Sequence, residues 1–120
     1  MWPLMMAKIF GPKSTPTKFE QFPKEMAFRP SQIRASAAES ALMIPDAFHF
    51  VDKYPELKMP VVIIACEDDR LIAIDKQSAR LHSDVSQSAF HRVAQNGHMI
   101  YQTATGEVMA AINEVAGNDA

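Results

Sequence analysis

The clearest hydrophobic pattern lies in the second half of the chain. Residues 61–65 (VVIIA) form an uninterrupted apolar run that ends in three acidic residues, Glu67, Asp68 and Asp69. Because this run is β-branched and apolar on both faces, it predicts a strand of a parallel sheet covered by helices. Residues 89–94 (AFHRVA) predict a second strand, and its mixed polarity favours a place at or near the sheet edge.

Helical patterns separate and follow these strands. Residues 75–82 predict a helix with Asp75 as its N-cap, so the order strand, helix, strand implies a parallel pair joined by a crossover. Residues 96–99 (NGHM) predict a tight turn, and residues 105–115 predict a last amphipathic helix. Together these elements predict the α/β class, with a short parallel sheet of two strands and flanking helices.

The first half has a different pattern. Five of the eight prolines lie within residues 1–30, which favours short helical pieces joined by extended turns. A following apolar stripe predicts a helix over residues 31–44, with Pro30 in its first turn and Pro45 at its end. A shorter helix is expected over residues 46–53. The stripe consists of Ile33, Ala37, Ala41 and Ile44.

Composition and charge narrow the function classes. The chain has 120 residues, of which 48% are hydrophobic and 22% charged, as is typical of a globular protein with one domain. The net charge of −2 provides no basic field, so neither nucleic acid nor an anionic membrane is an expected partner. No apolar run approaches the roughly 18 residues of a membrane span. The lone Cys66 suits a reducing compartment, so we expect a cytoplasmic location.

Candidate chemistry lies where the two predicted strands end. Asp69 follows the first strand and His98 follows the second, and the carboxyl ends of parallel strands share one rim of a sheet. The sequence therefore predicts that this acid and this histidine meet. A carboxylate that holds a histidine is two thirds of a Ser-His-Asp arrangement. The alternative for each residue is a solvated turn, which we expect for Glu67 and Asp68.

The remaining histidines and the cysteine predict no metal or cofactor site. His49, His82 and His91 share no spacing, and no second cysteine accompanies them, whereas zinc needs three or four convergent ligands. Cys66 ends an apolar strand, where a cysteine is usually a small buried hydrophobic residue. We therefore expect no cofactor.

The segments around Asp69 and His98 resemble the C-terminal end of the α/β-hydrolase fold. "PVVIIACEDDRLI" resembles the strand, turn and acid segment of that family, with Cys66 at the usual glycine position and Asp69 at the acid. "NGHM" resembles the Gly-His turn, which makes His98 the counterpart of the catalytic base. "ATGEVMAAI" resembles the closing helix, and residues 13–50 look like the later part of the lid.

This resemblance implies a partial α/β-hydrolase fold. Residues 1–54 would be a helical lid segment, and residues 55–120 would be the C-terminal part of the core. Asp69 and His98 would then be catalytic, in cofactor-independent hydrolysis of an ester or a similar acyl substrate. The resemblance extends equally to esterases, lipases, C–C hydrolases, haloperoxidase-like enzymes and epoxide hydrolases.

The sequence departs from the family at the nucleophile. None of the four glycines stands two residues before a serine, so the G-x-S-x-G elbow is absent, as is an HGGG-type oxyanion loop. We therefore expect the isolated chain to be inactive, and to self-associate or to need a complementing chain. It would act on a small-molecule substrate once an N-terminal portion completes it. The alternative is a non-catalytic remnant or a protein-interaction module that keeps the strand-helix-strand shape.

Overall fold

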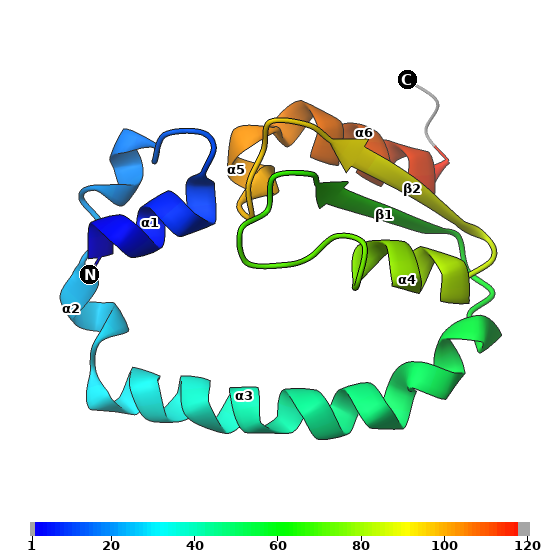
Figure 1. The fold of residues 1–120 in the computed structure, drawn as a ribbon, viewed down its shortest axis with the longest axis horizontal. Helices are drawn as coiled ribbons and strands as arrows, with labels where there is room; N and C mark the ends of the chain where they lie inside the picture. The colour runs from blue at the N-terminus through cyan, green and yellow to red at the C-terminus, as the bar shows by residue number, and fades with distance from the viewer. Residues whose placement is uncertain (1, 118–120) are drawn as a thin grey trace. The chain divides into compact units, whose positions relative to one another are not determined.

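A computed structural model of the chain describes residues 2–117 (Figure 1). These residues divide into two compact units, one formed by the residues up to 15 and those from 57 onward, the other by residues 16–56. The predicted division at residue 54 differs from this grouping, because the N-terminal helix belongs with the sheet. The helices of the first unit are α1 Trp2–Phe10, α4 Ser78–Asp84, α5 Ile100–Thr103 and α6 Thr105–Ala116.

The sheet of the first unit consists of two parallel strands. β1 (Val61–Cys66) pairs with β2 (Ser88–Val93) in a register that runs from Val61 opposite Ser88 to Cys66 opposite Val93. In Figure 1 the strand pair lies between α6 and α4, both of which contact it. The predicted α/β class, the two strands and the crossover between them are therefore confirmed.

The core of the first unit contains residues of α1 as well as residues near the strand ends and on α6. Phe10 at the end of α1 is 1% exposed and Val85, just before β2, is 0% exposed. Cys66 is buried at the end of β1, as predicted for a small hydrophobic residue. The other buried apolar residues are Met6, Ala104 and Ala111. Burial of Phe10 and Met6 explains why the N-terminal helix belongs to this unit.

The helix between the strands begins later than the sequence predicts. α4 starts at Ser78, and the prediction that Asp75 is its N-cap is wrong. The backbone around Ala73 forms turns first, since the Ala73 carbonyl accepts hydrogen bonds from the N–H groups of Lys76 and Gln77. The Asp75 carboxylate instead accepts a hydrogen bond from Arg92 Nη2 at 3.0 Å, which ties the crossover to β2.

The second unit is built around one long helix. α3 spans Pro30–Phe50 and η2 (Val51–Glu56) follows it, while η1 (Thr17–Phe19) and α2 (Lys24–Ala27) precede it. Pro30 lies in the first turn of α3, as predicted. The predictions that Pro45 ends the helix and that a separate helix covers residues 46–53 are wrong. An internal proline disturbs one turn, at a cost of about 3 kcal/mol, and the helical turns on both sides continue past it.

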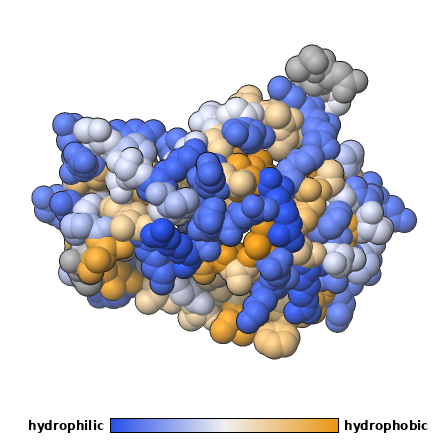
Figure 2. Space-filling model, turned by 45° about the horizontal axis from the view of Figure 1, so that its top comes forward, coloured by the Kyte–Doolittle hydropathy of each residue, from blue (hydrophilic) through white to orange (hydrophobic). Residues whose placement is uncertain are grey.

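Apolar side chains remain exposed on α3. Ile33 is 54% exposed and Ile44 is 69% exposed, so the stripe that predicted this helix is not buried. Figure 2 shows several patches of exposed apolar surface, in orange, between hydrophilic regions. None of the helices in residues 2–117 is long and apolar enough to span a lipid bilayer.

Candidate active site

The loop after β1 holds Asp69 through its own backbone. Asp69 Oδ1 accepts hydrogen bonds from the N–H groups of Leu71 at 2.7 Å and of Ile72 at 3.0 Å. This is the local turn that aspartate side chains form with the residues just after them. The Asp69 side chain is only 13% exposed. The loop therefore fixes one carboxylate oxygen and leaves the other, Oδ2, pointing out of the turn.

The loop after β2 turns earlier than predicted. Its tight turn lies at residues 94–95, where Gln95 has a φ of 55°, and not within residues 96–99. The Gln95 N–H donates a hydrogen bond to Asp68 Oδ2 at 2.9 Å. The prediction that Asp68 only faces solvent is therefore incomplete: the residue is exposed, yet it links the two loops. This link stabilises a backbone conformation that non-glycine residues seldom adopt.

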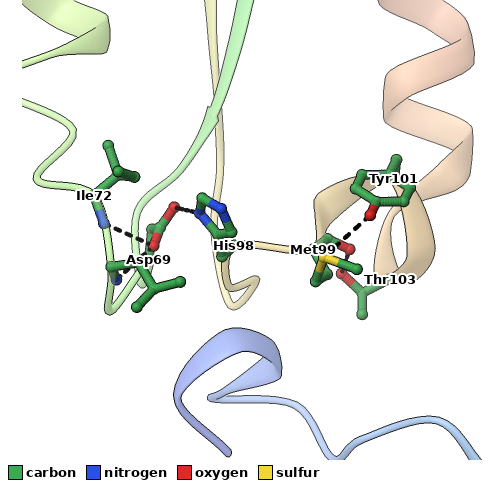
Figure 3. A network of polar contacts seen from close by, with 7 residues as sticks. Asp69, Ile72, His98, Met99, Tyr101 and Thr103 are labelled. Atoms are coloured by element: carbon green, nitrogen blue, oxygen red, sulfur yellow. Dashed lines mark hydrogen bonds and ion pairs between the residues drawn. The ribbon is translucent and has the colours of Figure 1, made fainter. Parts of the chain in front are cut away.

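The two loops bring Asp69 and His98 into contact. His98 Nδ1 lies 2.9 Å from Asp69 Oδ2, and Figure 3 shows the two side chains facing each other across the ends of the strands. The predicted proximity of these residues is confirmed, while their catalytic roles remain predictions. No hydrogen bond to His98 Nε2 is found within residues 2–117. In the neutral ring, an Nδ1–H bonded to the carboxylate leaves Nε2 as a proton acceptor.

The surroundings of Asp69 keep it ionised. Partial burial by itself would raise its pKa, but the hydrogen bonds from His98, Leu71 and Ile72 outweigh burial and hold the pKa of Asp69 below its ordinary value. The carboxylate is therefore charged at neutral pH. A charged carboxylate is what orients an imidazole and stabilises its protonated form.

The low pKa of Asp69 predicts a pH-dependent contribution to stability. The unfolded chain has the ordinary value of 3.8, and the folded value is lower, so the unfolded state binds more protons as the pH falls. Asp69→Asn should therefore lower the free energy of unfolding without unfolding the chain. This loss should have its full size above about pH 5 and should shrink as the pH falls through the folded pKa of Asp69. Urea unfolding at several pH values measures this difference. Glu67→Gln is the control, because no hydrogen bond or ion pair of the exposed Glu67 side chain is found within residues 2–117.

A small cavity adjoins the Asp69–His98 pair. Its volume is about 210 Å³ and its walls are mainly apolar. The polar groups in its walls belong to Asp69, His98 and Ser78, the first residue of α4. Sequence reasoning missed Ser78, because it lies in no recognisable motif and only the crossover brings it to the cavity. The apolar walls come from Ile64, Ala65, Cys66, Ile72, Ile74 and Ile100.

Cys66 is not suited to act as the nucleophile of this site. Burial, and then the negative charge of Asp69, raise the pKa of the Cys66 thiol to about 11. The thiol is therefore protonated at neutral pH, whereas the thiolate is the reactive form. Its place in the cavity wall is that of a small apolar side chain.

The other three histidines form hydrogen bonds but build no comparable site. His49 Nε2 accepts one from Lys53 Nζ at 3.3 Å, at an exposed position. His91 Nε2 contacts Glu114 Oε2 at 2.6 Å, and about half of each side chain is exposed, away from the cavity walls described above. The Ser88 hydroxyl donates to the Val85 carbonyl, so it accepts the hydrogen bond from His82 Nδ1 at 2.7 Å. A serine that donates its proton to a carbonyl is not activated by the histidine, so this contact is structural.

The described part of the chain, residues 2–117, contains no group of three or more His, Cys, Asp or Glu side chains placed to hold a metal ion. No protein-family model matches the chain, and neither a curated protein nor a solved structure matches it.

Proposed function

We propose that this chain is the C-terminal part of a cofactor-independent α/β-hydrolase, with Asp69 as the triad acid and His98 as the base. In this proposal residues 16–56 are lid, and the residues from 57 onward, together with those up to 15, form the C-terminal part of the core. The observation that carries the proposal is the 2.9 Å contact between Asp69 Oδ2 and His98 Nδ1 at the carboxyl ends of two parallel strands. The nucleophile comes from an N-terminal portion, since the sequence has no elbow motif.

The proposed reaction is acyl transfer in two steps. A serine hydroxyl from the completing portion attacks the ester carbonyl, and His98 Nε2 accepts the hydroxyl proton as the new C–O bond forms. His98 returns this proton to the leaving alcohol when the ester bond breaks. Water then attacks the acyl-enzyme by the same route. Throughout, Asp69 holds Nδ1–H and stabilises the positive charge on the ring.

The cavity and the net charge define the proposed substrate and surroundings. A cavity of about 210 Å³ with mainly apolar walls suits a short aliphatic acyl group placed beside His98. The substrate is therefore a small molecule, and neither nucleic acid nor a membrane is a partner in this proposal. The location that we propose is cytoplasmic, in keeping with a single buried cysteine.

A second candidate function is protein interaction without catalysis. It is favoured by the large apolar side chains that stay exposed on α3, such as Leu42 at 60% and Phe48 at 76%. Contiguous exposed apolar surface often marks a protein interface. In this case the Asp69–His98 contact would only stabilise the two loops.

Complementation distinguishes the two candidates. The chain is co-expressed with the N-terminal portion of an α/β-hydrolase that contains a G-x-S-x-G elbow and an oxyanion loop, and hydrolysis of p-nitrophenyl butyrate is measured. The isolated chain should be no faster than free imidazole, because it lacks both the nucleophile and the oxyanion hole. The complex should hydrolyse the ester. This activity should disappear in His98→Ala and persist in His91→Ala, which removes the other histidine–carboxylate pair.

The results of the complementation experiment distinguish the two candidate functions. A stable complex with no hydrolysis, or activity that survives His98→Ala, contradicts the hydrolase proposal. Turnover by the isolated chain that is lost in His98→Ala would show that it contains its own nucleophile, and Ser78 in the cavity wall would be the first serine to replace.

A further inference from the structure

The N-terminal helix contacts both loops of the candidate site. Arg70, the residue after Asp69, donates a hydrogen bond from Nη1 to the carbonyl of Ala7 at 3.3 Å. On the other loop, Gly97 precedes His98 and lies against the carbonyl end of α1. One segment of chain therefore reaches the neighbours of both Asp69 and His98.

The approach at Gly97 leaves no room for a side chain. A Cβ atom at Gly97 would overlap the carbonyl oxygen of Gly11 and would lie 3.0 Å from those of Ile9 and Phe10. These are backbone atoms, so no side-chain rotation can relieve the overlap. The glycine is needed here for close approach and not for an unusual φ angle.

The segment that makes these contacts is itself firmly held. Phe10 is 1% exposed and Met6 is 8% exposed, so the inner face of α1 is part of the core. Beyond the helix, Lys13 Nζ donates a hydrogen bond to the carbonyl of Thr103 at 3.0 Å, at the end of α5. Lys13 therefore ties residues 2–13 to α5, a point outside the two loops.

We propose that residues 2–13 form a brace that holds the two loops at the spacing needed for the Asp69–His98 hydrogen bond, with Arg70 and Gly97 as positioning residues. The loops themselves are connected by Asp68 and the Gln95 N–H, at their exposed side. The brace contacts the residue after Asp69 and the residue before His98. A histidine–carboxylate pair in which the histidine is partly exposed is weak unless its geometry is imposed by the surrounding chain.

The consequence of the brace for catalysis rests on the proposed function, but its effect on the Asp69–His98 contact does not. The test therefore measures that contact directly, by nitrogen-15 NMR of histidine-labelled chain. With the brace in place, His98 should be in the Nδ1–H form. Gly97→Ala should give a mixture of the Nδ1–H and Nε2–H forms, because the added methyl separates the loops from α1. The pKa of Asp69 should rise toward its ordinary value in the same variant, since the bond from His98 contributes to its depression.

A matched control comes from the same chain. Gly106→Ala adds the same methyl at a position where nothing lies within 4 Å, and it should leave the His98 signals unchanged. Arg70→Ala removes the bond to Ala7 and the packing of the guanidinium against Gly11, and it should give a smaller shift in the same direction. Arg70→Lys keeps a hydrogen-bond donor, so its His98 signals should lie closer to those of the wild type than the signals of Arg70→Ala do.

The possible results either support or overturn the brace. A folded Gly97→Ala chain with wild-type His98 signals and a wild-type Asp69 titration overturns it. If circular dichroism shows that Gly97→Ala does not fold, the His98 signals of Arg70→Ala provide the test instead. Unchanged His98 signals in Arg70→Ala overturn the proposal. If the signals shift as expected but the complemented enzyme shows no hydrolysis, the brace stands and the hydrolase proposal fails.

Discussion

Replacing Asp69 by asparagine in the complemented enzyme should lower kcat by up to about 10⁴-fold while leaving the fold intact. The amide oxygen of asparagine can still accept the hydrogen bonds from Leu71 and Ile72 that shape the loop. The amide nitrogen, however, is a donor, and it cannot accept the Nδ1–H of His98. The ring would then take the other tautomer, and Nε2 would no longer accept the proton of the nucleophile.

The neighbouring carboxylate supplies the matched control. Asp68→Asn makes the same chemical change one residue earlier, where the only hydrogen bond that the carboxylate accepts within residues 2–117 comes from the Gln95 N–H. An asparagine oxygen can accept that bond equally well, so the loss in kcat should be less than about tenfold. Steady-state kinetics of both variants with p-nitrophenyl butyrate provide the comparison. Equal losses, or a larger loss for Asp68→Asn, would show that the triad acid has been assigned to the wrong residue.

The isolated chain should self-associate instead of forming a stable monomer of 13.4 kDa. The sheet has only two strands, so each strand has an edge without a partner among residues 2–117. A two-stranded sheet is marginally stable alone, and an open apolar edge promotes pairing with another chain. Exposed apolar side chains on α3 should promote association further.

Size-exclusion chromatography with light scattering and a thermal melt measures this behaviour. Co-expression with the N-terminal portion of an α/β-hydrolase should raise the soluble yield. Phe48→Lys should reduce association, because this phenylalanine is 76% exposed on α3. Ser40→Lys adds the same charge to the same helix at a polar, exposed position, and it should have a smaller effect. A sharp cooperative melt from a monodisperse monomer would contradict the prediction.

The elements that the sequence alone determined are those with a strong local pattern. Residues 61–65 are β-branched and apolar on both faces, and they form β1 within one residue of the predicted end. The amphipathic pattern of residues 105–115 predicted the last helix, found as α6. The meeting of Asp69 and His98 also followed from the sequence, because parallel strands joined by a crossover necessarily end at one rim.

Contacts between distant residues decided the rest. Whether Asp75 caps a helix or pairs with Arg92 depends on the position of β2, which no local pattern encodes. The place of Ser78 in the cavity wall and the contact of Gly97 with α1 join segments that are far apart in the sequence. Pro45 marks a boundary by local rules, yet α3 continues through it, because a single broken turn is outweighed by the regular turns around it. Local propensities set which segments are helix or strand, and tertiary contacts set where they end and which side chains meet.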